Sequence, residues 1–164
     1  MKKWWVKNKK LFIIIKYMIE KFKSSEKILF INKYNKYNLL VFTSSTFLLP
    51  SYYAYINKFY ILSLLSFIIS IISSGHWYNV NNFSLRIMDL IIAKVCFVTY
   101  LTVLIFYTNF GFIDILLLKT MILFYYISNN RLSNKKEDWV YYHVLFHTFA
   151  TIDQIVTLYG LIRK

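Results

Sequence analysis

Apolar residues dominate five long stretches of the chain, and short polar stretches separate them. Each stretch has about the length that an α-helix needs to cross a hydrocarbon core of ~30 Å, at a rise of about 1.5 Å per residue. The fourth stretch is the shortest, and we expect its helix to take in flanking residues. The pattern predicts an all-α, polytopic membrane bundle of about five transmembrane helices, over residues 39–56, 59–78, 85–107, 112–127 and 139–162.

The composition excludes a water-soluble globular domain. Of the 164 residues, 58% are hydrophobic and 21% are aromatic. A soluble domain of this size could not bury so much apolar surface, whereas a lipid bilayer accepts an apolar exterior. The low glycine and proline content also disfavours a β-rich fold with many tight turns. The single cysteine, Cys96, excludes an intramolecular disulfide framework.

The first 36 residues differ from the rest of the chain in charge. They hold eleven lysines against two glutamates, with aromatic and aliphatic residues between the lysines. This pattern is typical of an amphipathic helix on a membrane surface, where each lysine near an anionic leaflet contributes on the order of 1 kcal/mol. We expect a basic membrane-surface segment, 1–36, and a transmembrane bundle, 37–164, with membrane lipids and anionic headgroups as partners.

Two other interpretations of the basic segment remain at this stage. The first is a disordered basic tail. The second is nucleic-acid binding, which a basic patch with aromatic residues also fits; the chain carries no recognition motif for it, so we expect no nucleic-acid partner. Lysine is abundant throughout, together with asparagine, isoleucine, phenylalanine and tyrosine. Their codons are AT-rich, which indicates an AT-rich genome such as that of a virus, a protist or a low-GC bacterium.

Basic residues are distributed unevenly between the two sides of the predicted bundle. A basic N-terminal segment stays in the cytoplasm by the positive-inside rule. Five spans then place the second and fourth connections on the cytoplasmic side as well. The bias predicts a multi-pass protein with a cytoplasmic N-terminus. The predicted cytoplasmic side holds Arg86, Arg131, Lys135 and Lys136, against Lys58, Arg163 and Lys164 on the other side.

All three histidines fall in or beside predicted spans, and the predicted topology places them at one depth. His143 and His147 are four residues apart and therefore share one helix face, from which two imidazoles can chelate a single zinc. His76, from another helix, supplies a third ligand. Three protein ligands with one open position are typical of a catalytic zinc site. The less specific interpretation of a lone histidine is a hydrogen bond to a neighbour at the headgroup level.

Two kinds of oxygen group lie near these histidines in the predicted topology. Asp89, one turn into the third span, could hold or deprotonate a water molecule at the zinc. Ser73 and Ser74 precede His76 by three and two residues, and one of these hydroxyls could hydrogen-bond the water or a polarised carbonyl. Both have a structural alternative: Asp89 pairs with Arg86 or Lys94 at the interface, and the serines are small residues that allow helices to pack closely in membranes.

The order of these residues resembles the superfamily of alkaline ceramidases and progestin/adiponectin receptors. A serine and a histidine close one span, an aspartate opens the next, and an HxxxH pair lies in the last. The resemblance implies a zinc site and hydrolysis of a lipid amide. The superfamily has seven spans, so two helices would be missing here or supplied by a second copy. By position, the zinc ligands would be His76, His143 and His147, with Asp89 handling the water and Ser73 supplying the hydroxyl.

A second set of charges lies deeper in the predicted spans. Asp153 and Lys119 are both about two turns from the outer end, and we expect them to pair across adjacent helices. A polar path through the membrane is the alternative. The leading functional hypothesis is a zinc-dependent hydrolase of a lipid amide or ester. The alternatives are a non-enzymatic membrane scaffold or remodelling protein of viral type, and a small transporter.

Overall fold

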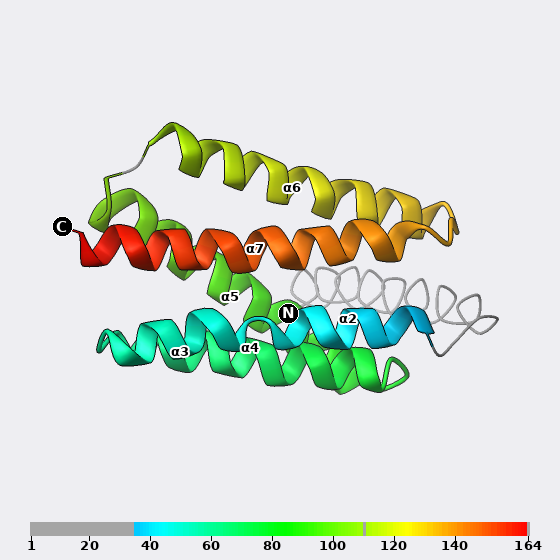
Figure 1. The fold of residues 1–164 in the computed structure, drawn as a ribbon. Helices are drawn as coiled ribbons and strands as arrows, with labels where there is room; N and C mark the ends of the chain where they lie inside the picture. Colours follow the sequence, from blue (N-terminus) through cyan, green and yellow to red (C-terminus); the bar gives the residue numbers. More distant parts are fainter. Residues whose placement is uncertain (1–34, 110, 164) are drawn as a thin grey trace, which may run out of the picture. The chain divides into compact units, whose positions relative to one another are not determined.

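The computed structural model describes residues 35–109 and 111–163, and this part of the chain contains helices and no strand (Figure 1). The basic segment predicted over 1–36 lies outside the described residues apart from its last two. The helices are α2 (Asn35–Ser45), α3 (Leu48–Ile56), α4 (Tyr60–Tyr78), α5 (Phe83–Tyr107), α6 (Phe112–Ser133) and α7 (Trp139–Ile162).

Five helical segments are long and apolar enough to cross a membrane, which confirms the predicted fold class. The first combines α2 and α3 over Tyr37–Ile56, and the other four are α4, α5, α6 and α7. The fourth span is longer than the apolar run 112–127, because the polar residues after this run continue α6 to Ser133. This agrees with the expectation that the short stretch takes in flanking residues.

The first span consists of two helices with a break between them. Two backbone N–H groups bond three residues back at this point, from Thr46 to the Thr43 carbonyl and from Phe47 to the Ser44 carbonyl. Pro50 lies in the first turn of α3 and has no N–H to continue the ladder across the break. The break therefore follows from the proline, which a helix tolerates in its first turn and not in its interior.

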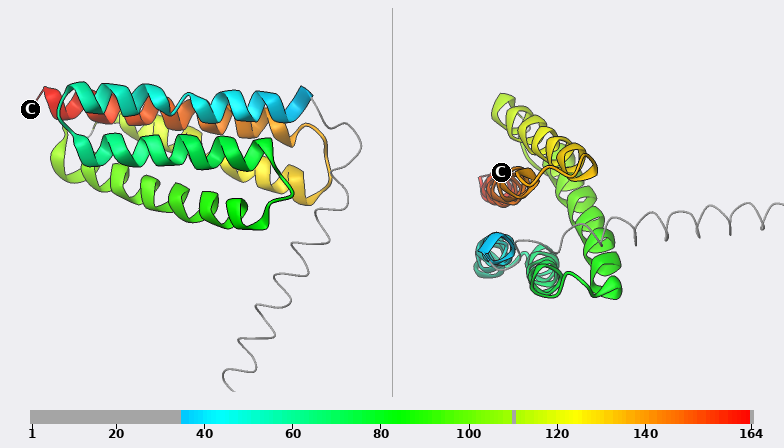
Figure 2. Two further views of the ribbon diagram at one scale, coloured as in Figure 1. Left: turned by 90° about the horizontal axis from the view of Figure 1, so that it is seen from below. Right: turned by 90° about the vertical axis from the view of Figure 1, so that its right-hand side faces the viewer.

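Helices α4 and α7 contribute most to the interior of the bundle. Helix α4 packs against α2, α3 and α5, whereas α7 packs against α2, α3, α5 and α6. The views in Figure 2 agree on this arrangement, with α5 and α6 at the periphery. Helices α5 and α6 accordingly have the lowest buried share of the five spans, 17% and 11%.

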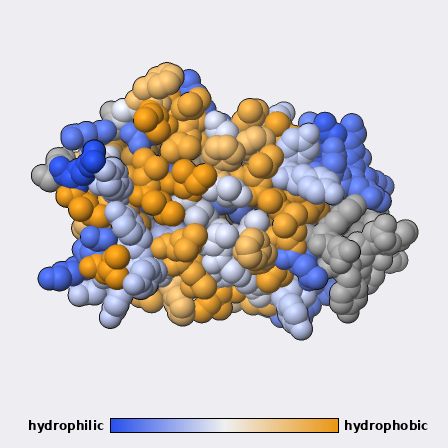
Figure 3. All heavy atoms as spheres, in the orientation of Figure 1, coloured by the Kyte–Doolittle hydropathy of each residue, from blue (hydrophilic) through white to orange (hydrophobic). Residues whose placement is uncertain are grey.

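The interior of the bundle is unusually polar, and its exterior is apolar. Figure 3 shows apolar residues over the middle of one face, with hydrophilic residues towards its two ends. Hydroxyl and amide side chains bond across helices inside, as between Thr46 and Thr151 at 3.0 Å and between Ser66 and Gln154 at 3.0 Å. This distribution suits a protein whose outer surface meets lipid. The buried serines of α4 recur at helical spacing: Ser63, Ser66, Ser70 and Ser73.

Candidate functional site

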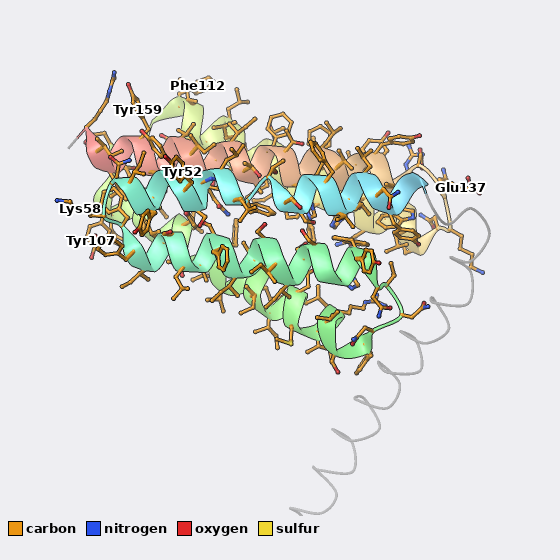
Figure 4. All side chains as sticks on the ribbon, turned by 60° about the horizontal axis from the view of Figure 1, so that its bottom comes forward. Tyr52, Lys58, Tyr107, Phe112, Glu137 and Tyr159 are labelled. Carbon is orange, nitrogen blue, oxygen red and sulfur yellow. The ribbon has the colours of Figure 1, made fainter. Side chains whose placement is uncertain are left out.

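The candidate site lies at one end of the bundle, which we call the histidine end. It is the end formed by the α4–α5 turn, residues 79–82, and the α6–α7 turn, residues 134–138. Figure 4 shows Glu137 at this end, and Lys58 and Tyr107 at the opposite end. Because α4 finishes here while α5 and α7 begin here, all five residues singled out in the sequence belong to this half of the bundle: Ser73, His76, Asp89, His143 and His147.

His147 is buried in the interior and bonds to α2. Its Nδ1 lies 3.3 Å from the Thr43 hydroxyl and 3.3 Å from the Ser44 hydroxyl. The Thr43 hydroxyl also lies within hydrogen-bond distance of two backbone carbonyls of its own helix, and a hydroxyl that donates its hydrogen to a carbonyl accepts from the imidazole. These contacts fit the tautomer with the proton on Nδ1, which leaves the lone pair on Nε2.

His143 makes a similar contact with α6. Its Nδ1 lies 3.2 Å from the Ser128 hydroxyl. That hydroxyl donates to the Trp139 carbonyl at 3.3 Å and so accepts from the imidazole. The rings of His143 and His147 lie 4.7 Å apart between centroids, as their four-residue spacing predicts. With both protons on Nδ1, the two neighbouring imidazoles would each present an Nε2 lone pair.

His76 lies on α4 beside an aromatic group. Its ring centroid is 4.5 Å from that of Trp77, which in turn lies 5.1 Å from the His143 ring. His76 and His143 are also close enough to interact electrostatically. The His76 Nδ1 and the Trp77 Nε1 are both buried, and neither has a hydrogen-bond partner within the described ranges. Buried polar atoms are normally paired, so these two are candidates to meet a ligand.

Ser73 and Asp89 join the site through a chain of hydroxyls. The Ser73 hydroxyl lies 3.0 Å from that of Ser44, which contacts His147. On its other side Ser73 is a hydrogen-bond partner of the Asp89 carboxyl. The chain His147–Ser44–Ser73–Asp89 therefore crosses four helices, α7, α2, α4 and α5. Ser73 lies three residues before His76 and shares its helix face.

The donor set fits zinc chemically, although the side chains are not drawn together around one point. Ligating histidines usually donate their other N–H to an oxygen, and the Nδ1 atoms of His143 and His147 both lie within hydrogen-bond distance of a hydroxyl oxygen. Across residues 35–109 and 111–163, however, no group of three or more histidine, cysteine, aspartate or glutamate side chains is arranged to hold a metal ion. A zinc site over these residues therefore requires side-chain rearrangement.

Three features of the site were not predicted from the sequence. Thr43 and Ser44 come from the first span, and Ser128 from the end of α6. The polar run Thr43–Ser44–Ser45 inside an apolar stretch was the available signal for the first two. Ser128 carried no comparable signal, because it lies where the apolar run of α6 ends.

The expected pairing of Asp153 with Lys119 is not found. Asp153 is buried on α7, whereas Lys119 is exposed on α6, and the part of the chain that the structure describes contains no ion pair between them. The physical reason is rotational, because the two residues lie on adjacent helices but on faces that do not meet. The ion pair that does link α6 to the start of α7 is Arg131–Asp138, at 2.7 Å.

Comparison of the chain with protein-family models, with curated proteins and with solved structures returns no match. The resemblance to the ceramidase superfamily therefore depends on the arrangement of residues alone.

Proposed function

We propose that this integral membrane protein is a zinc-dependent hydrolase of a lipid amide or ester. One observation supports the proposal: His143 and His147 direct their Nδ1 atoms at the hydroxyls of Ser128 and Thr43, and they lie at the same end of the bundle as His76 and Asp89. An imidazole that donates from Nδ1 and keeps its lone pair on Nε2 is in the form that binds a metal ion.

His76, His143 and His147 are the residues that would hold the zinc. When bound, zinc supplies a Lewis acid that polarises a carbonyl and activates a water molecule. The Asp89 carboxylate accepts the proton of the attacking water. Ser73 orients Asp89 through their hydrogen bond. Hydrolysis adds this water across the acyl bond and releases a fatty acid with an amine or an alcohol.

The location of the site also suits a lipid substrate. The histidine end is the end where α4 and α6 finish and α5 and α7 begin, so helices that cross a bilayer would bring it towards the level of the lipid headgroups. The acyl bond of a membrane lipid lies at this boundary, between the apolar chains and the polar headgroup. A substrate could thus reach the site while its acyl chains remain in the bilayer.

The test of the proposal is metal content together with turnover. We expect protein purified in detergent to retain about one zinc per chain, since catalytic sites bind one ion through three ligands. We also expect it to release fatty acid from a ceramide or a lipid ester, and to lose this activity after treatment with a chelator. Protein that is folded but free of zinc, and inactive after zinc is added, would favour the non-enzymatic scaffold instead.

We further propose that the histidine end faces the cytoplasm, because more of the loop lysines and arginines belong to this side. The basic segment 1–36 would then bind the anionic inner leaflet. The check is cysteine labelling in a Cys96→Ser background, with single cysteines at Asn134 and Asn109, which lie in connections at opposite ends. We expect a membrane-impermeant reagent on the cytoplasmic side to label position 134 alone. Labelling of position 109 alone would reverse the orientation.

A further inference from the structure

A lysine lies near the middle of α5 on the outer surface of the bundle. Lys94 is exposed, and the residues one turn before and after it on the same face are apolar and also exposed. Here Ile91 is 55% exposed and Val98 60%. This face is not covered by another helix of the described chain. We call it the Lys94 face, and it consists of Ile87, Leu90, Ile91, Lys94, Phe97 and Val98.

The depth of Lys94 separates it from ordinary interfacial lysines. It is eleven residues from Phe83 and thirteen from Tyr107, the two ends of α5. At the rise of an α-helix these distances are ~16 Å and ~20 Å. A lysine stem has four methylene groups and cannot carry its ammonium group over that distance to a membrane surface. Lys119 is different, because it is only seven residues, ~10 Å, from the start of α6.

The chain itself offers Lys94 no counter-charge within the described ranges. Neither an ion pair nor a hydrogen bond of Lys94 is formed there. The nearest acidic residue on α5 is Asp89, five residues earlier, which places it ~140° around the helix. Asp89 also faces inwards, towards Ser73. A charge exposed to lipid at this depth is costly, and charges in spans normally pair with one another.

We propose that the Lys94 face binds a transmembrane helix of another protein that carries a carboxylate near the middle of the bilayer. The apolar residues around Lys94 would pack against the apolar flanks of that helix, and the carboxylate would pair with the ammonium group. We infer an acidic partner because the ammonium group of Lys94 is positive and the described part of the chain supplies no negative group to pair with it.

A second copy of this chain would not supply a carboxylate at the depth of Lys94. In a two-fold dimer with its axis along the membrane normal, each residue meets residues of similar depth. Lys94 would then meet Lys94 of the other copy. The other acidic residues in the described spans are not available at this depth, because Asp153 is buried and Asp114 caps the first turn of α6 at the far end.

A synthetic transmembrane helix tests the proposal. The probe is a polyleucine peptide with one central glutamate, labelled for energy transfer to the full-length protein in vesicles of neutral lipid. The matched peptides carry glutamine or leucine at the same position. We expect the glutamate peptide to bind at least ~10-fold more tightly than the leucine peptide, with the glutamine peptide between them, because a charge pair in lipid outweighs a neutral hydrogen bond.

Variants of the protein test whether Lys94 is the residue that binds the glutamate of the peptide. Lys94→Leu should abolish the preference for glutamate, whereas Lys119→Leu, which also removes an exposed lysine from a span, should keep it. Far-ultraviolet circular dichroism checks that both variants remain helical. Equal binding of all three peptides, or a glutamate preference that survives Lys94→Leu, would overturn the proposal. Self-association of the full-length protein that disappears in Lys94→Leu would also overturn it, since the occupant would then be a second copy.

Discussion

Replacing His147 by alanine is expected to remove zinc from the purified protein. His147 is buried, and its Nδ1 lies within hydrogen-bond distance of two hydroxyls from α2. With two histidines left, the site has one protein ligand fewer than the three that catalytic zinc needs. Zinc measured by mass spectrometry should fall from about one per chain to near zero. His143→Ala is expected to give the same result.

The matched control for this experiment is Gln154→Ala. Gln154 is also buried on α7 and hydrogen-bonded, but it lies seven residues further along, ~10 Å from His147. Its loss should destabilise the bundle by a comparable amount and leave zinc in place. If His147→Ala retains stoichiometric zinc, or if both variants lose it equally, the histidines are not its ligands.

Substitution of the hydroxyl residues next to the two rings should weaken zinc binding without abolishing it. Thr43→Val removes one of the two hydroxyls next to His147 Nδ1, and Ser128→Ala removes the hydroxyl next to His143 Nδ1, without touching the ligands themselves. Loss of such supporting groups typically lowers metal affinity by about 10- to 100-fold. Chelator competition should detect this change. Ser133→Ala, an exposed serine at the end of α6, is the control and should leave affinity unchanged.

The five spans were predictable because, in a membrane protein, the length of an apolar run is the main signal for a membrane-spanning helix. A run of apolar residues about as long as the bilayer is thick has one main structural solution, and each predicted run became a helix or a pair of helices. The break in the first span depended on Pro50, which the sequence displays but whose effect depends on where the helix starts. The continuation of α6 to Ser133 is polar, and so it gave no hydropathy signal.

The neighbours of the site residues were harder to predict, because a linear pattern does not say which helices meet. The four-residue spacing predicted that His143 and His147 would be adjacent, since this depends on one helix only. The contact of His147 with Thr43 and Ser44 depends on the packing of α7 against α2, which no local pattern encodes. Asp153 and Lys119 show the same limit, because their depths were estimated but the faces they occupy were not.

One periodic signal could have indicated the interior. In soluble proteins apolar spacing marks the buried face, but in this bundle both faces of each helix are largely apolar, and the polar residues mark the inside. The serines of α4 recur every three or four residues from Ser63 to Ser73, and all four are buried. His76 lies about one turn after Ser73 on the same helix. The serine spacing therefore predicts that His76 faces the interior, where the structure has it.

Asp89→Asn is expected to abolish hydrolysis while the protein keeps its zinc. The substitution preserves the shape of the side chain and its contact with Ser73, but an amide cannot accept a proton from water. Loss of a general base typically lowers the rate by about 10²- to 10⁴-fold. The measurement is fatty-acid release by enzyme with and without the substitution, at equal zinc content. Ser73→Ala should give a smaller loss, because Ser73 only positions the carboxylate.

Asp153→Asn is the matched control for Asp89→Asn, since it makes the same chemical change at another buried carboxylate. Asp153 lies six residues beyond His147 on α7, ~9 Å towards the opposite end of the bundle, and it belongs to none of the hydrogen bonds that link the site. Activity of the Asp153→Asn variant should stay close to that of the unmodified protein. If Asp89→Asn remains active, or if both variants lose activity together, Asp89 is not the base. If zinc is lost in Asp89→Asn alone, the carboxylate is instead a ligand of the metal, and the proton must go to another group.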